Sequence, residues 1–306
     1  MATHRRAPAY QVIDGEVCYI YFDPILYRKA HNFEPQDGDI IEVTYPRCGS
    51  HWIQQIIQLI LERGESAKTF EEFSDRAPFL EMNELKPTKK PRLIRTHLPI
   101  GKVKFSKKAK YVYVARNPWD CCVSCFHLIR ETPACKFSDG TFDDFLDTFL
   151  RARMGAGDYL DNVMAAFDLK DEDNVFFVTY EELHERKADV IVRLADFLGE
   201  EYGRCLRENE EVFHRVVAKS TLSFMKEFLR PNAGQVRVLL DKDTGQIASS
   251  SSTEMSESKV LQLVRQGTVG DWKRHFSAEN IRAMQAYIDT KTKGSKVMSL
   301  WKDLQM

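Results

Sequence analysis

The 306-residue sequence lacks the features that would place it in a membrane or outside the cell. No apolar run approaches the ~20 residues that a membrane-spanning helix needs. The first eight residues include basic side chains, but no apolar stretch follows them, so we expect no secretory signal. The 7 cysteines are an odd number without the spacing of a disulfide framework. We therefore expect a cytoplasmic protein with reduced thiols.

An excess of charge is also lacking, because 44 Lys and Arg oppose 45 Asp and Glu, for a formal net charge of −1. This balance argues against nucleic acid and anionic membranes as partners. The one basic stretch, residues 86–110, is open to two interpretations: a polyanion-binding patch, or a solvated surface around a buried strand, which we favour. Hydrophobic residues reach 43%, which is enough for a sizeable core. The expected partner is a small molecule.

The order of apolar segments predicts alternating strands and helices. Residues 39–44, 111–115 and 174–178 have the composition of short buried strands. Apolar residues recur at helical spacing over 52–61, and again over 191–197 before a glycine. This alternation predicts one α/β domain over 1–306, with a central parallel sheet flanked by helices. Ligands of such sheets bind at the carboxyl ends of the strands.

Two segments fit neither element. We expect a flexible N-terminus over about residues 1–15. We also expect a mobile loop over about residues 231–258, which include Asn-Ala-Gly, Asp-Lys-Asp and a run of four serines. Loops of this length serve as lids or binding loops, or are disordered.

The segment Thr44-Tyr45-Pro46-Arg47-Cys48-Gly49-Ser50-His51-Trp52 lies between the first expected strand and its helix. Free backbone N–H groups and the positive end of the helix dipole favour an anion such as phosphate at this junction. Arg47 supplies a permanent charge, Gly49 permits close approach of the backbone, and Ser50 supplies a hydroxyl. The G-x-x-x-x-G-K-[ST] pattern is absent, so this P-loop-like segment predicts a phosphate-bearing ligand without ATP hydrolysis. A simple tight turn is the alternative.

Four segments, in this order, resemble motifs of the cytosolic sulfotransferases. The loop at residues 44–52 resembles T-Y-P-K-S-G-T-T-W, and Arg95–Pro99 resembles K-T-H-L-P. Residues 113–118, followed by Ser124, resemble the 3′-phosphate motif, and residues 265–273 resemble R-K-G-x-x-G-D-W-K. The resemblance implies a transferase that moves sulfonate from 3′-phosphoadenosine-5′-phosphosulfate (PAPS) to a hydroxyl or amine. The nucleotide product is adenosine-3′,5′-bisphosphate (PAP), and no metal is required.

The resemblance also implies the roles of individual residues. His97 is the expected base, because imidazole titrates at about 6.5 and can accept a proton at neutral pH. Arg47 and Arg95 are the expected stabilisers of charge on the departing phosphate. The implied donor-binding residues are Arg47, Cys48, Gly49, Ser50, His51, Trp52, Arg116, Ser124, Tyr180, Ser220, Leu222, Arg265, Gln266 and Gly267.

The sequence departs from the family motifs at five of these positions. Arg47 and Arg95 stand where the family has Lys, and His51 stands where it has Thr. Gln266 replaces a Lys, and Leu222 replaces the aromatic residue that stacks on adenine. Arginine cannot donate a proton, but it can stabilise charge. A PAPS- or PAP-binding protein with little catalytic activity is therefore the alternative. His97 favours the enzyme, since a mere binder has no use for a base.

The acceptor is predicted only as a class. Phe22, Phe79 and Phe126 fall in segments that line the acceptor pocket of the family, which suggests a small aromatic phenol, catecholamine-like compound or alcohol. Glu131 could pair with an amine. A carbohydrate sulfotransferase and a P-loop kinase are weaker alternatives.

Two further patterns concern metal and oligomeric state. Cys121, Cys122 and Cys125 permit a zinc interpretation, but no second pair follows, and packing of free thiols explains them better. The family's dimer motif, K-x-x-x-T-V-x-x-x-E, is degraded here, with Arg282 in place of its Glu. Monomer and homodimer are both left open.

Overall fold

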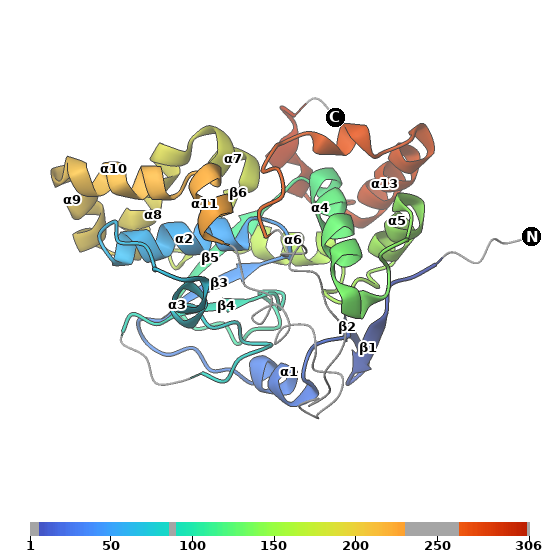
Figure 1. Ribbon diagram of the computed structural model, residues 1–306, viewed down its shortest axis with the longest axis horizontal. Coiled ribbons are helices and arrows are strands. Elements are labelled where there is room, and N and C mark those ends of the chain that lie inside the picture. The colour runs from blue at the N-terminus through green and yellow to red at the C-terminus, as the bar shows by residue number, and fades with distance from the viewer. Residues whose placement is uncertain (1–5, 86–89, 230–262, 305–306) are drawn as a thin grey trace, which may run out of the picture.

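The computed structural model describes residues 6–85, 90–229 and 263–304. Its centre is a four-stranded, all-parallel sheet with the strand order β4-β3-β5-β6 (Figure 1). The strands are β3 (Ile40–Thr44), β4 (Leu93–Thr96), β5 (Lys110–Ala115) and β6 (Val175–Thr179). The predicted α/β architecture with a central parallel sheet is therefore confirmed.

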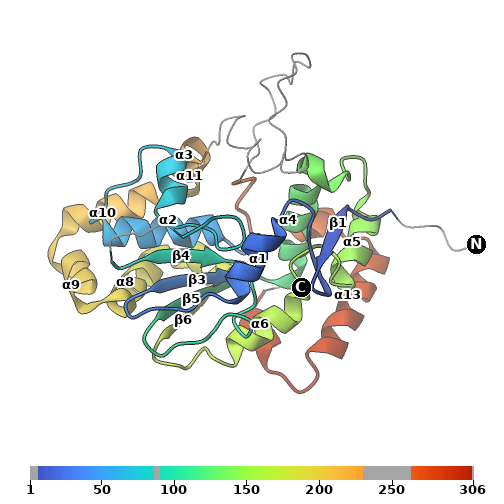
Figure 2. The same cartoon turned by 90° about the horizontal axis from the view of Figure 1, so that it is seen from below.

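Both faces of the sheet are buried, which explains why its strands are almost continuously apolar. Ile41 and Tyr113 pack into the larger hydrophobic cluster on one face, with α4 (Pro118–Glu131) and α6 (Tyr159–Phe167). Val112 packs into a second cluster on the other face, with α2 (Ser50–Leu61) and α8 (Lys187–Leu198). Helices α8, α9 and α10 gather at one end of the molecule, and α5 and α13 gather at the other (Figures 1 and 2).

The remaining helices surround this core, and all of them except α13 are short. They are α1 (Pro24–His31), α3 (Phe70–Asp75), α5 (Phe142–Leu150), α7 (Tyr180–Glu185), α9 (Glu200–Glu208), α10 (Glu210–Lys219), α11 (Leu222–Phe228) and α13 (Ala278–Lys291), with the 3₁₀ helices η1 (Pro133–Cys135), η2 (Asp271–Arg274) and η3 (Val297–Trp301).

Local sequence explains where the helices that frame the site begin. Asn117 caps α4, because its side chain accepts a hydrogen bond from the Asp120 N–H. Pro118 occupies the first turn, where a missing N–H has no cost. Gly49 precedes α2 in a left-handed conformation, and Gly199 follows the last residue of α8.

The N-terminal segment differs from the expectation of a flexible terminus over about residues 1–15. Within it, β1 (Tyr10–Ile13) pairs antiparallel with β2 (Glu16–Tyr19). Buried Ile13, Cys18 and Tyr19 anchor this β1–β2 hairpin to the main core. The expected mobile loop at 231–258 lies outside the described residues. Among the helices that the structure describes, none is long and apolar enough to cross a lipid bilayer.

Candidate active site

All four parallel strands lead directly into residues that the sequence predicts for the site. The loop with Arg47 follows β3, His97 follows β4, Arg116 follows β5, and Tyr180 follows β6. The strand order reverses at β3, which has β4 on one side and β5 on the other. Ligands of α/β sheets bind at such topological switch points.

A cavity opens at this edge of the sheet, and we call it the loop cavity. Most of the predicted donor-binding residues line it, and so does the predicted base. The predicted residues that line it are Arg47, Gly49, Ser50, His51, Trp52, His97, Arg116, Ser124, Tyr180, Leu222, Arg265, Gln266 and Gly267. The sequence therefore located a real constellation of side chains, drawn from segments more than 200 positions apart.

The backbone of the loop is shaped to receive an anion. Gly49 has φ of 103°, and a Cβ atom there would lie 3.0 Å from the ring of Tyr180, so only glycine fits without strain. Arg47 also has a positive φ, of 70°. The first turn of α2 receives no side-chain cap from its N-cap residue. Its N–H groups and the helix dipole therefore favour negative charge in the loop cavity.

Two arginines join the loop to the start of α4. The Arg47 Nε donates to Ser124 Oγ at 3.0 Å, and its Nη1 donates to the carbonyl of Leu263 at 3.2 Å. The Arg116 Nη1 donates to the Arg47 carbonyl at 3.0 Å, and its guanidinium lies 4.3 Å from the ring centroid of Tyr180. Arg47 is thus in direct contact with both members of the expected 3′-phosphate pair, Arg116 and Ser124.

The C-terminal segment is attached to α4 by a residue that the sequence analysis missed. Asp120 accepts hydrogen bonds from the N–H groups of Gly270 at 2.7 Å and Trp272 at 3.0 Å. Arg265 lines the loop cavity and forms an ion pair with Asp271. Asp120 therefore determines where Arg265 and its neighbours lie. The only sequence signal was an acid in the first turn of a predicted helix.

Not all predicted donor residues line the loop cavity. Cys48 is fully buried beneath it, and Ser220 contributes its carbonyl, which accepts from Trp52 Nε1 at 2.8 Å. The rings of Trp52 and Tyr180 meet edge to face, with centroids 5.4 Å apart. Leu222 closes this side, and a Cβ on Gly267 would lie only 2.4 Å from it.

The ring of His97 is held in one orientation and one tautomer. Its Nδ1 lies 2.7 Å from the Thr44 carbonyl oxygen, which can only accept, so Nδ1 carries the proton and Nε2 carries the lone pair. Burial, helped by the charge of Arg95, lowers the pKa of His97 to about 3. In the free protein the imidazole is therefore neutral at physiological pH.

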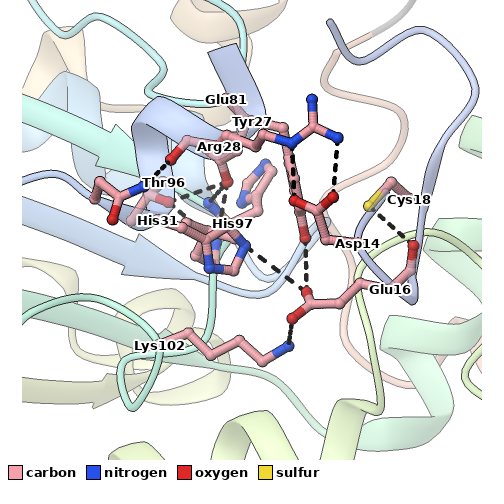
Figure 3. A network of polar contacts seen from close by, with 12 residues as sticks. Asp14, Glu16, Cys18, Tyr27, Arg28, His31, Glu81, Thr96, His97 and Lys102 are labelled. Atoms are coloured by element: carbon pink, nitrogen blue, oxygen red, sulfur yellow. Dashed lines mark hydrogen bonds and ion pairs between the residues drawn. The ribbon is translucent and has the colours of Figure 1, made fainter. Parts of the chain in front are cut away.

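Glu81 accepts a hydrogen bond from the backbone of His97, and the sequence analysis did not identify it. Its Oε1 accepts from the N–H groups of His97 at 2.6 Å and Leu98 at 3.0 Å, and from the hydroxyl of Thr96 at 3.0 Å (Figure 3). Burial raises the pKa of Glu81 to about 7, although these bonds oppose the shift. The buried Oε2 has no hydrogen-bond partner among the described residues.

Arg95 does not line the loop cavity, but it contacts His51, which does. Its Nη1 donates to His51 Nε2 at 2.9 Å and to Gln54 Oε1 at 3.2 Å, and its guanidinium lies 4.8 Å from the ring centroid of Phe79. Because a guanidinium can only donate, His51 Nε2 must accept, and the proton of His51 resides on Nδ1. Burial, then the charge of Arg95, keeps the pKa of His51 well below its usual range. His51 is therefore neutral.

A second cavity, which we call the hairpin cavity, adjoins the β1–β2 hairpin and has a volume of about 180 Å³. Tyr19, Phe22 and Tyr27 contribute aromatic walls, and His97 lines this cavity as well as the loop cavity. Its polar lining includes Glu81 together with Glu16 and Lys102, whose side chains form an ion pair of 2.6 Å (Figure 3).

The three predicted acceptor phenylalanines fall in different places. Phe22 lines the hairpin cavity. Phe79 contacts the ring of His97 edge to face, with centroids 4.8 Å apart. Phe126 is buried against Phe142 and Phe145 and contributes to neither cavity in the part of the chain described. Its ring packs in the aromatic core formed with these two residues.

The buried cysteines pack together below the loop. The sulfur atoms of Cys48 and Cys121 are 3.8 Å apart, and the thiols of Cys121 and Cys125 both approach the carbonyl of Pro46. Within the described ranges, no group of three or more His, Cys, Asp or Glu is placed to hold a metal ion. This geometry favours thiol packing over a zinc site.

The fold and the site define a class of protein: an α/β enzyme with a cationic, anion-binding loop at its strand ends and a neutral histidine between two cavities. The family model described as "Sulfotransferase domain" matches residues 37–296. The chain belongs to the cytosolic sulfotransferase family and is a PAPS-dependent sulfotransferase. The resemblance carried by the four motifs is confirmed.

Several relatives show how far the similarity extends. Mouse sulfotransferase 2B1 is 33% identical over 262 residues, covering 82% of this chain and 70% of the relative. Rabbit amine sulfotransferase is 27% identical over 287 residues, covering 91% and 89%. Among solved structures, mouse sulfotransferase SULT7A1 complexed with PAP has a TM-score of 0.71 at 23% identity, covering 95% of this chain and 97% of that one. Retinol dehydratase, solved with androsterone and PAP, also has a TM-score of 0.71, at 22% identity and with 94% and 91% coverage.

Proposed function

We propose that this enzyme transfers the sulfonate of PAPS to a hydroxyl or amine of a small aromatic acceptor, with His97 as the base. The observation that carries the proposal is that His97 lines both cavities. The nucleotide donor would occupy the loop cavity and the acceptor the hairpin cavity. The imidazole would then stand where the acceptor oxygen meets the sulfonate.

The proton and electron pairs balance in a single in-line step. The neutral Nε2 of His97 takes the proton of the acceptor hydroxyl as the acceptor oxygen forms its bond to sulfur. The bond from sulfur to the bridging oxygen breaks, and its electron pair leaves with the phosphate of PAP. The resulting imidazolium shares its Nδ1–H with the Thr44 carbonyl, which keeps the ring oriented throughout.

Negative charge on the leaving phosphate would be stabilised by fixed cations and dipoles. Arg47 and the uncapped first turn of α2 face the loop cavity. Arg95 acts through His51. Because the Nε2 of His51 accepts from Arg95, its proton lies on Nδ1, which can donate to an oxygen of PAPS. These groups supply the charge without a metal ion, so we propose that none is needed.

The hairpin cavity supports a compact, flat acceptor. Its aromatic walls of Tyr19, Phe22 and Tyr27 suit a phenol-like ring. The printed names of relatives include an amine sulfotransferase, and androsterone is bound in one solved neighbour, so acceptors vary within this family. We propose phenols, catecholamine-like compounds and small alcohols as the substrate class, acted on in the cytoplasm.

The test is transfer of labelled sulfonate from PAPS to a panel of phenols, catecholamines and sterols, with and without EDTA. We expect transfer to single-ring acceptors that survives EDTA. A protein that binds PAP but transfers to no acceptor would instead be a nucleotide-binding protein. A strict requirement for Mg²⁺ would contradict the charge assignment to Arg47 and the loop.

A further inference from the structure

A buried carboxyl lies beneath the donor side and plays no part in the mechanism above. Glu42 stands in the middle of β3 with 0% of its surface exposed. Side chains alternate along a strand, so Glu42 shares the α2 face of the sheet with Ile40. Both of its carboxyl oxygens are buried and lack a hydrogen-bond partner among the described residues. A buried polar group without a hydrogen-bond partner costs free energy, so its presence calls for an explanation.

The neighbour of Glu42 across the sheet is Arg95. The two are register partners between β3 and β4, whereas the register partner on β5 is Val112. In the described chain Arg95 and Glu42 form no direct ion pair, and the Arg95 Nε is buried without a partner. Both Arg95 contacts toward α2 go to neutral groups, His51 and Gln54. The carboxyls whose charge acts on Arg95 are Glu42 and Glu81, so its charge is balanced by these groups when they are ionised, or by a bound anion.

The protonation state of Glu42 decides whether this carboxyl balances the charge of Arg95. Burial raises the pKa of Glu42 to about 8, and Arg95 is the one charged group that opposes the shift. Near neutral pH the carboxyl is mostly neutral, so the guanidinium charge remains available. When Glu42 ionises, it cancels that charge in a low-dielectric interior, where charges interact strongly.

We propose that Glu42 is a positioning residue for the nucleotide donor. In its neutral form it leaves the charge of Arg95 free to attract the phosphate and sulfonate groups through His51. In its ionised form it cancels that charge. This inference rests on the proposed binding of PAPS and PAP in the loop cavity. Thermodynamic linkage then requires that an anionic nucleotide favour neutral Glu42. Affinity is greatest below pH 8 and falls as the pH rises through 8.

The experiment is the dissociation constant of PAP between pH 7 and 9.5, by calorimetry, for the wild type and Glu42→Gln. The pH range starts at 7 because a phosphate monoester is already dianionic there, with a second pKa of about 6. We expect wild-type affinity to fall about tenfold more across this range than that of Glu42→Gln, as cancelling one nearby charge implies. Glu81, whose pKa is raised to about 7 and whose charge also acts on Arg95, is present in both proteins, so the comparison isolates Glu42.

Two further variants keep the test decisive. Glu42→Leu removes the carboxyl without burying an amide, and we expect the same flattened profile if Glu42→Gln folds poorly. Glu200→Gln changes a carboxyl that is 85% exposed on α9, and its profile should match the wild type. Identical profiles in the wild type and both Glu42 variants would overturn the inference. Failure of every protein to bind PAP at any pH would instead overturn the proposed function.

Discussion

The loop cavity and the hairpin cavity differ in how their residues are encoded. The loop cavity is built from the ends of parallel strands, the first turn of α2 and more distant segments such as 263–267, and most of its residues fall in short motifs. The hairpin cavity combines β2, the residues after β4 and the segment 152–157, which no single motif connects. Phosphate recognition relies on backbone geometry and leaves a sequence signature, whereas acceptor recognition relies on side chains brought together only by the fold.

The two cavities also differ in charge. Arg47, Arg116 and Arg265 line the loop cavity, which suits a polyanionic nucleotide. In the hairpin cavity, Lys102 is already paired with Glu16, which also accepts a hydrogen bond from the Tyr27 hydroxyl at 2.9 Å. Electrostatic substitutions should therefore act mainly through the donor, and shape substitutions mainly through the acceptor.

The largest effect is expected where the two cavities meet. His97→Ala should lower turnover by ~10²–10⁴, the usual contribution of a general base, while the affinity for PAP stays nearly unchanged. Steady-state turnover of a phenol and calorimetry with PAP give the two readouts. A variant that turns over at the wild-type rate would show that His97 merely separates the cavities.

On the donor side alone, Arg47→Met should lower turnover by about 10²–10³, because it removes a charge that stabilises the leaving phosphate. Arg47→Lys keeps the charge and should retain substantial activity. If the protein is mainly a nucleotide binder, Arg47→Lys should instead raise a negligible wild-type rate. Measuring both variants beside the wild type, with PAP affinity determined separately, distinguishes these outcomes.

A smaller donor-side effect is expected at Asp120. Asp120→Ala leaves the N–H groups of Gly270 and Trp272 unpaired and frees the segment that carries Arg265. We expect PAP binding to weaken roughly tenfold, in line with the cost of unpaired buried groups. The acceptor KM at saturating PAPS should not change, and a shift confined to that constant would contradict the assignment.

The smallest expected effect is a difference in acceptor KM between variants of two phenylalanines. Phe22→Leu should raise the acceptor KM a few-fold, because Phe22 lines the hairpin cavity, whereas Phe126→Leu should leave that KM unchanged. Phe126→Leu should instead lower the melting temperature, since the ring is 4% exposed in the aromatic core. Equal changes in KM would extend the acceptor site beyond the hairpin cavity.

The sequence predicted much of the loop cavity, because short motifs mark its residues. Buried apolar runs located β3, β5 and β6. The predicted catalytic and donor-binding residues line the loop cavity, apart from Cys48, Arg95 and Ser220. Roles of these residues stay predictions until they are tested.

The features that the sequence did not predict depend on contacts between distant segments. The flexible terminus expected over about residues 1–15 includes β1, because a four-residue strand gives little periodicity. Glu81 lies 16 positions from His97, and Asp120 lies 150 positions from Gly270, so neither role is visible in a local pattern. The sequence does not show which face of α4 meets the core, so the contacts of Phe126 with Phe142 and Phe145 could not be predicted. The oligomeric state, which the sequence leaves open, depends on contacts outside one chain.

The most direct test of the account is a crystal structure of the complex with PAP and a phenol. The account predicts PAP in the loop cavity, with a phosphate near Arg47, and the phenol in the hairpin cavity. The phenolic oxygen should lie within hydrogen-bond reach of His97 Nε2, about 2.6–3.2 Å. A phenol bound elsewhere, or a hydroxyl turned away from His97 toward another base, would contradict the claim that the two cavities meet at this histidine.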